Sequence, residues 1–243
     1  MFKKYFKKVY KTRLKKLKAR YKRDLKERNE KFISILNHDI KTVLLAQIQT
    51  LKLFLENKVP KETLYEVLNS NYFLYEIVQN TIFLSDYENS NAPLRLENVN
   101  IAQIADIIKA SVEMYAKTKN QNIILKTNSK NINCKADKLY INKIIYNLIT
   151  SAVSYGFEGS DIEISIKENK NSISFKTKNK SCYMSKDKIK NILKDKSVND
   201  FNQLGMNLNL SIANKLILAH KWDVIACSNK DNTGVLGFVV KKS

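Results

Sequence analysis

Apolar residues recur three and four positions apart, without a break, over residues 32–55. This period is typical of one face of an α-helix. Residues 37–42 lie inside the pattern, and a spacing of four puts His38 and Thr42 one turn apart on one helix face, with Asp39 beside them. An imidazole, a carboxylate and a hydroxyl are then presented together from one helix. A surface histidine of a helical bundle, without a chemical role, is the alternative.

The helical pattern breaks at residues 57–61, where Pro60 fits the first turn of a following helix. Apolar residues continue at helical spacing from residue 64, which predicts a second helix to about Tyr87. Two amphipathic helices joined by a short turn make an antiparallel helical hairpin. Because one hairpin cannot bury so wide an apolar stripe, we expect two copies of the chain to pair as a dimeric four-helix bundle.

After a linker predicted over residues 89–99, strands mix with helices. A capping box of Asn100 and Gln103 opens a helix to about Lys117. Further helices are predicted over 138–155, 186–193 and 210–220, and strands over 122–126, 161–167, 172–177, 223–228 and 235–241. The sequence therefore predicts an α+β chain, in which the helical hairpin is followed by an α/β sandwich domain.

Positive charge is concentrated at the N-terminus. Residues 1–31 hold fifteen Lys or Arg and three acidic residues, in a chain of net charge +20. An apolar stripe at about helical spacing predicts a basic helical extension over residues 1–23. Its role stays open between pairing with a second copy, peripheral contact with an anionic membrane surface, and non-specific attraction of nucleic acid. No zinc-finger, RNA-binding or helix-turn-helix pattern accompanies the charge, so we expect no specific nucleic-acid partner.

Cysteine usage and hydropathy predict the compartment. Cys134, Cys182 and Cys227 are well separated and show no metal-ligand spacing, which favours reduced thiols and no structural metal. No apolar run approaches the roughly 18–20 residues that cross a bilayer, and no secretory signal precedes the first helix. We expect a soluble cytoplasmic protein.

Two groups of residues carry a resemblance to a known family. The stretch from Phe32 to Thr42 is similar to the phosphoacceptor box of sensor histidine kinases of two-component systems, F-x-x-x-x-S-H-[DE]-[LI]-[KR]-[TN]-P-L. The family's ATP-binding helix box and C-terminal part are matched by Asp137, Ile141, Asn147, Leu148, Ala152, Tyr155, residues 210–215, His220 and Ser228. The resemblance implies a dimerising hairpin over residues 24–88 with His38 as the phosphoacceptor. It implies an ATP-binding domain over residues 100–243.

The nucleotide-binding boxes depart from the family's pattern. Asn147 is kept, but the second asparagine of the helix box, which coordinates the nucleotide's magnesium in the family, is Ser151 here. The adenine box D-x-G-x-G-I corresponds to residues 179–184, where Asn179 replaces the aspartate and Ser181 replaces the first glycine. The charge-assisted bond to adenine is then lost, although Asn179 could still form a hydrogen bond to it.

The phosphate-lid box, G-x-G-L-G-L in the family, keeps Gly205 but has Asn207 and Asn209 in place of the other two glycines. Asparagine tolerates positive φ, so we expect the loop to keep its shape with less room for phosphate. If an intact site bound ATP at ~100 µM, losing two interactions with charged groups would raise the dissociation constant to ~10 mM or more. ATP binding is therefore doubtful, and we expect a degenerate pocket.

The same resemblance implies that the residues for the phosphatase reaction are kept on the helical hairpin. In the family, removal of phosphate from an aspartate of the response regulator needs a polar residue one turn after the histidine, and Thr42 occupies that place. Its hydroxyl would orient the hydrolytic water, and Asp39 would position His38 or the partner's groups. The Mg²⁺ of this step would lie on the regulator, and we expect no metal site in this chain.

These residues predict a homodimeric phosphatase that acts on the receiver domain of a cognate response regulator, with little or no autokinase activity. Two alternatives stay open. The chain could be an active kinase or phosphorelay protein that carries phosphate on His38, or it could sequester a regulator without catalysis.

Overall fold

The computed structural model describes residues 40–89, 93–193 and 204–242. The predicted basic extension over 1–23 lies outside these residues, as do His38 and Asp39. The chain divides into two compact units, residues 1–60 and 61–243. Among the described residues, no helix is both long and apolar enough to cross a membrane.

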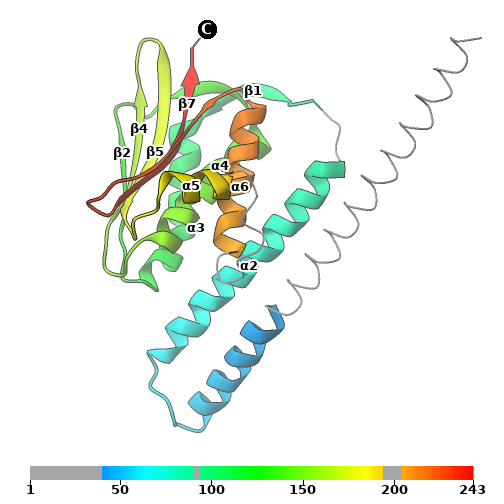
Figure 1. Ribbon diagram of the computed structural model, residues 1–243, viewed down its shortest axis with the longest axis vertical. Helices are drawn as coiled ribbons and strands as arrows, with labels where there is room; N and C mark the ends of the chain where they lie inside the picture. Colours follow the sequence, from blue (N-terminus) through cyan, green and yellow to red (C-terminus); the bar gives the residue numbers. More distant parts are fainter. Residues whose placement is uncertain (1–39, 90–92, 194–203, 243) are drawn as a thin grey trace, which may run out of the picture. The chain divides into compact units, whose positions relative to one another are not determined.

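In the first unit, residues 40–55 form a helix, drawn in blue in Figure 1. The helical pattern predicted for this segment is confirmed over its described part. Asn57 ends the helix with a φ of 55°, a left-handed conformation that asparagine adopts more readily than most residues. The amide of Lys58 donates to the carbonyl of Leu53 (2.9 Å) and that of Asn57 to Phe54 (3.0 Å), as in a Schellman cap.

The second unit begins with helix α2 (Thr63–Asn89), which confirms the predicted second helix. Within this unit α2 packs against helix α6 (Leu204–Ala219) and buries Leu74 and Ile77. The pairing of the two long helices as a hairpin, and of two chains as a bundle, stay predictions.

Five strands of the second unit form one sheet in the order β2-β4-β5-β7-β6. They are β2 (Ile123–Thr127), β4 (Ile162–Glu168), β5 (Ser172–Lys180), β6 (Asp223–Ser228) and β7 (Thr233–Lys241). β2 and β4 are parallel, and the other neighbours are antiparallel. All five strands agree with the sequence prediction to within three residues at each end.

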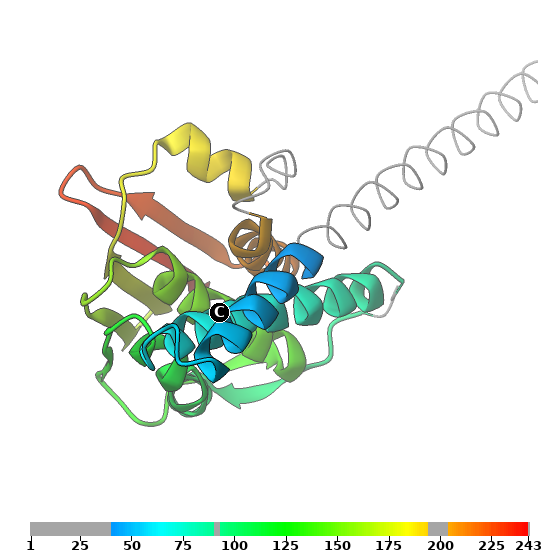
Figure 2. The same ribbon diagram turned by 90° about the horizontal axis from the view of Figure 1, so that it is seen from below.

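One face of the sheet is covered by α3 (Ile101–Lys117), α4 (Lys138–Tyr155) and α6, while the short α5 (Lys186–Leu193) lies beside β6 (Figures 1 and 2). Side chains of β5 alternate accordingly. Ile173, Phe175 and Thr177 are buried, and Lys176 and Lys178 are exposed. Apolar and polar residues alternate along these strands because only one face of the sheet is covered.

Two short strands were not predicted. β1 (Leu96–Asn100) pairs in antiparallel fashion with β3 (Asn133–Asp137), and β1 lies mostly within the predicted linker of residues 89–99. Each strand ends on the residue that caps the next helix. Asn100 Oδ1 accepts from the amides of Ala102 (3.0 Å) and Gln103 (3.2 Å), which confirms the helix start predicted there. Five-residue strands with few apolar residues carry too little periodicity to be recognised.

The C-terminal end of α4 is held by one lysine. Lys119 Nζ donates to the carbonyls of Val153 (2.8 Å), Ser154 (2.9 Å) and Gly156 (2.9 Å). These carbonyls have no partner inside the helix, and a cation there also complements the helix dipole. Burial lowers the pKa of Lys119, while the charge of Glu158 acts in the opposite direction. Lys119 therefore fixes the position of α4 against the turn that follows α3.

We expect Lys119→Met to lower the free energy of unfolding by about 2 kcal/mol, because three partly buried carbonyls lose a charged donor. Urea unfolding followed by circular dichroism measures this loss. Lys117→Met is the matched control, since Lys117 is exposed in the last turn of α3. Equal unfolding midpoints for the two variants would contradict the role assigned to Lys119.

Candidate functional site

The helix-box residues lie inside the second unit. Asn147 and Ser151 are one turn apart on α4, and both are fully buried. Neither the amide of Asn147 nor the hydroxyl of Ser151 has a hydrogen-bond partner among the described atoms. Buried polar atoms without a partner are rare in folded proteins, and a water or a ligand group usually satisfies them. These two positions are therefore polar but enclosed.

The adenine-box residues Asn179 and Ser181 lie together at the end of β5. They line a cavity of about 20 Å³, walled also by Tyr155 of α4, Leu210 of α6 and Gly234 of β7. A volume of this size holds about one water molecule. Asn179 Nδ2 donates to the carbonyl of Ala152 (2.9 Å), so its amide is engaged with the α4 backbone.

Gly234 explains why the cavity is narrow. A Cβ at this position would lie 2.8 Å from Ser181 Oγ and 2.9 Å from Asn179 Oδ1. The side chains that replace the family's aspartate and glycine thus lie against the β7 backbone, and only a glycine is accommodated opposite them. Ser181 adds a side chain beside β7 where the family's pattern has a glycine, whereas Asn179 is the same size as the aspartate of that pattern.

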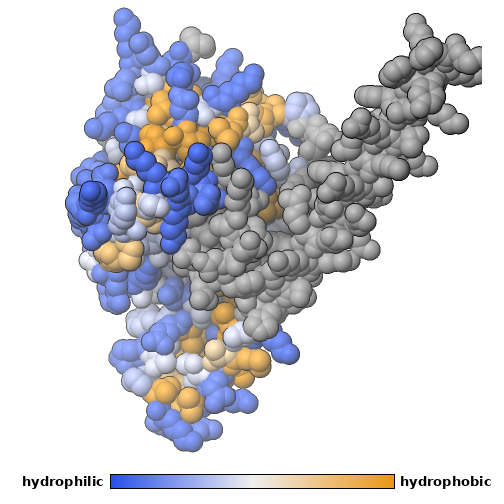
Figure 3. Space-filling view, viewed as in Figure 1, coloured by the Kyte–Doolittle hydropathy of each residue, from blue (hydrophilic) through white to orange (hydrophobic). Residues whose placement is uncertain are grey.

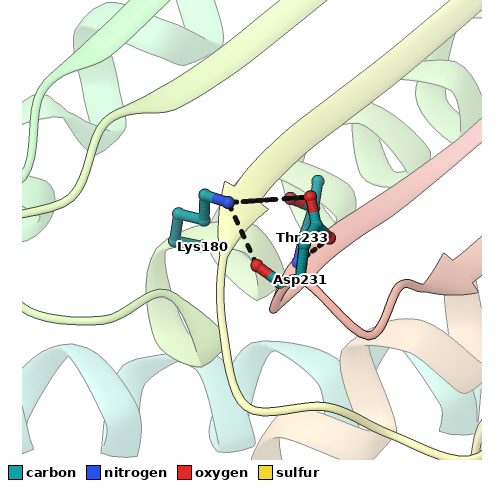
Figure 4. Close-up of polar contacts among 3 residues, drawn as sticks. All are labelled: Lys180, Asp231 and Thr233. Carbon is teal, nitrogen blue, oxygen red and sulfur yellow. Dashed lines mark hydrogen bonds and ion pairs between the residues drawn. The ribbon is translucent and has the colours of Figure 1, made fainter.

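A polar cluster holds the β6–β7 turn against the end of β5 (Figure 4). Lys180 Nζ donates to Thr233 Oγ1 and to the carbonyl of Asp231, both at 3.1 Å. Thr233 in turn donates to the Asp231 carboxylate through its amide (3.1 Å) and its hydroxyl (3.0 Å). Lys180 and Asp231 are exposed and Thr233 is buried, so the cluster joins the surface of the turn to the strand residue that precedes Gly234.

The lid box differs from the expected loop. Residues 205–210 lie in the first turns of α6, which begins at Leu204. Replacing glycine by asparagine lowers the cost of helix formation, which accounts for a helix where a loop was expected. Gly205 and Asn207 have helical backbone, and the side chain of Asn207 lies outside the described part of the chain.

Asn209 is buried and is not among the residues that line the cavity. Its Nδ2 donates to Glu76 Oε2 of α2 (2.8 Å) and to Thr150 Oγ1 of α4 (3.3 Å), and Asn80 of α2 donates to its Oδ1. The structure thus brings Asn179 and Ser181 together but directs Asn209 toward α2. Sequence analysis missed Glu76, Asn80 and Thr150. A carboxylate between Leu74 and Ile77, in the apolar stripe of α2, was the available signal.

Glu76 is 3% exposed. Burial raises the pKa of its carboxyl, while the hydrogen bonds from Asn209 and Thr150 and the charge of Lys143 act in the opposite direction. Lys143, on α4, is half-buried, and burial lowers its pKa to about 8. A buried carboxyl group and a half-buried amino group therefore act on one another between α2 and α4.

Thr42 is exposed on the helix of residues 40–55. His38 and Asp39 lie outside the described residues, so their juxtaposition with Thr42 stays a prediction. Across the described ranges, no group of three or more His, Cys, Asp or Glu side chains could hold a metal ion.

His220 has a packing role at the start of α4. Its Nε2 accepts from the amide of Asp137 (3.1 Å), and its Nδ1 lies 2.8 Å from the carbonyl of Leu216, which requires the neutral ring with the proton on Nδ1. The ring also stacks near Trp222, with 4.5 Å between centroids. Asp137 Oδ1 accepts from the amides of Leu139 (3.1 Å) and Tyr140 (3.3 Å), so His220 orients the residue that caps the helix.

Comparisons with known proteins agree with this fold. Residues 136–241 match the family described as histidine kinase-, DNA gyrase B-, and HSP90-like ATPase. Histidine kinase P4 of Formosa agariphila is 29% identical over 58% of this chain and 11% of its own length. Sensor histidine kinase YvrG of Bacillus subtilis is 22% identical over 88% of this chain and 38% of its own length.

The solved complex of histidine kinase ThkA with the response regulator protein TrrA has a similar fold. Its TM-score is 0.62 at 17% identity, and the match covers 88% of this chain and 61% of that chain. The chain spans between 11% and 38% of the length of the curated relatives it matches.

We expect stability to fall as the pH drops below about 6.5, in a manner that depends on His220. Burial lowers its pKa in the fold below the ordinary 6.5, so the unfolded chain takes up a proton first. Its contribution is therefore complete above pH 6.5 and is lost as the pH falls toward the lowered folded value. His220→Gln should flatten this part of the profile, measured by urea unfolding at several pH values. The chain has one other histidine, and His38→Gln should leave the slope unchanged. The opposite ranking of the two slopes would overturn the assignment.

Proposed function

We propose that this histidine kinase-type protein acts in two-component signalling and removes phosphate from the aspartate of a cognate response regulator. Thr42 is the residue that orients the hydrolytic water. ATP-dependent phosphorylation of His38 is weak or absent. The observation that carries this proposal is the contrast between a nearly filled nucleotide cavity and a solvent-exposed Thr42 on its helix.

The described walls do not fit a bound Mg-ATP. The cavity beside Asn179 has room for about one water molecule. The polar side-chain atoms of Asn147 and Ser151, which would have to hold the magnesium, are buried. No step of the proposed reaction therefore passes through ATP.

The proposed hydrolysis needs few groups from this chain. The Thr42 hydroxyl accepts a hydrogen bond from a water molecule and holds it in line with the phosphorus of the aspartyl phosphate. The water oxygen bonds to phosphorus as the bond to the aspartate oxygen breaks. The aspartate leaves as a carboxylate, and both water protons remain on the released phosphate. The Mg²⁺ that stabilises charge in this step belongs to the regulator's own site.

The proposed partners are the regulator's receiver domain and a second copy of the chain. ThkA, which has a similar fold, was solved in complex with a response regulator, which supports the first partner. Large apolar side chains at the surface of the helix of residues 40–55, visible near the lower end of Figure 3, support the second. They are Leu44, Leu45, Ile48, Leu51 and Leu55.

We expect Thr42→Ala to slow release of phosphate from a phosphorylated cognate regulator about a hundredfold, because the water loses its orienting hydroxyl. Thr42→Ser, which keeps the hydroxyl, should retain most of the activity. His38→Ala should also remain active, because the histidine carries no phosphate in this reaction. Phosphate release is measured without nucleotide.

Two results would contradict the phosphatase proposal. Unchanged release with Thr42→Ala, together with tight regulator binding, would indicate a sequestering protein. Acid-labile label on His38 after incubation with labelled ATP would indicate an active kinase or a phosphorelay protein.

We expect 1 mM Mg-ATP to leave the melting temperature unchanged. At a dissociation constant of ~10 mM, binding would add less than about 0.1 kcal/mol, whereas a site of ~100 µM would add about 1.4 kcal/mol. The latter corresponds to a rise of roughly 3–6 °C for a domain of this size. Differential scanning fluorimetry, with Mg²⁺ alone as the control, measures the difference. A rise of several degrees would contradict the closed pocket.

A further inference from the structure

Helix α2 inserts a polar pair into the second unit. Glu76 and Asn80 lie one turn apart on α2, and they are 3% and 1% exposed. Both point at Asn209 near the start of α6. Asn209 Nδ2 donates to Glu76 Oε2 (2.8 Å), and Asn80 Nδ2 donates to Asn209 Oδ1. The single amide of Asn209 therefore bonds to two successive turns of α2.

The position of Asn209 in the sequence gives this contact its meaning. It is the third glycine position of the lid box in the family's pattern, and a glycine has no side chain with which to form these bonds. An asparagine amide has donors and an acceptor, and Asn209 uses both ends. Its second donor reaches Thr150 Oγ1 (3.3 Å), which ties α4 to the same contact.

Glu76 depends on this partner. Its other oxygen, Oε1, has no hydrogen-bond partner among the described atoms. Removing the Asn209 side chain would take the 2.8 Å donor from a buried carboxyl, and a buried polar group that loses a hydrogen bond costs free energy. Asn209 and Glu76 therefore stabilise one another, which a glycine at position 209 could not do.

Aromatic contacts enclose the pair on both sides along α2. Tyr72, one turn before Glu76, stacks on Tyr115 of α3 with 5.1 Å between centroids. Phe83, beyond Asn80, meets Tyr140 of α4 edge to face at 5.9 Å. These rings exclude water from the polar pair, and a hydrogen bond shielded from water is electrostatically stronger.

We propose that Glu76, Asn80 and Asn209 form a clamp that fastens α2 to the ATPase-like domain without nucleotide. The lid-box position then acts as a positioning contact between the helix and the domain instead of a phosphate-binding loop. The clamp itself is independent of the proposed phosphatase activity. The clamp would also keep the domain in one position relative to α2 while the regulator is bound, whether or not nucleotide is present. This consequence rests on the proposed phosphatase activity.

Hydrogen exchange of the full chain, measured without regulator, tests the clamp. Asn209→Gly should raise the opening equilibrium of the α2 amides around residues 73–84 about tenfold to a hundredfold, the effect of losing a hydrogen bond to a charged group. Asn214→Gly is the matched control. This variant makes the same change from asparagine to glycine five positions further along α6. The side chain of Asn214 donates to the carbonyl of Leu193 and not to α2.

Asn209→Ala covers the case in which the glycine variant fails to fold, because alanine favours the helix and still removes the amide. It should loosen α2 to a similar extent, and adding 1 mM Mg-ATP to the unchanged chain should not alter α2 exchange. Equal α2 exchange in Asn209→Ala, Asn214→Gly and the unchanged chain would overturn the clamp. Since no regulator is present, that result would leave the Thr42 test of the phosphatase reaction intact.

Discussion

Helix α4 is held at both ends by side chains from distant parts of the sequence. At its start, Asp137 caps the helix and is oriented by His220, which follows α6. At its end, the ammonium group of Lys119 bonds to three carbonyls. Several of the candidate nucleotide residues are placed relative to this helix. Asn147 and Ser151 lie on it, and Asn179 bonds to its backbone.

The side chains at positions 179 and 181 face Gly234 near the C-terminal end of α4. The cavity that they line has the volume of about one water. At position 209 the added amide extends in another direction and meets Glu76. At all three positions a polar residue replaces a glycine or a charged residue of the family's pattern. At positions 179 and 181 the side chain lines the cavity, whereas at position 209 it binds α2.

Sequence periodicity predicted the long elements well and the short ones poorly. The helix of residues 40–55, α2, α4 and all five strands of the main sheet were expected within a few residues, because each carries a regularly spaced set of apolar residues. β1 and β3 were missed because they pair mainly with each other and bury few side chains. The start of α6 was expected as a loop, since the family's glycines suggested one, but asparagine supports a helix there.

The sequence by itself determined which residues stand at the positions that resemble the family's boxes. The magnesium amide, the adenine aspartate and the glycines at positions 181, 207 and 209 of the pattern are all replaced. Residue identity is enough for that statement, because a hydroxyl or an amide has the same donors and acceptors in any fold. Only the tertiary structure decided where those side chains point. Asn179 closes a cavity and Asn209 binds α2, because the partners Ala152 and Glu76 lie 27 and 133 positions away in the chain. No local pattern reports contacts over such separations.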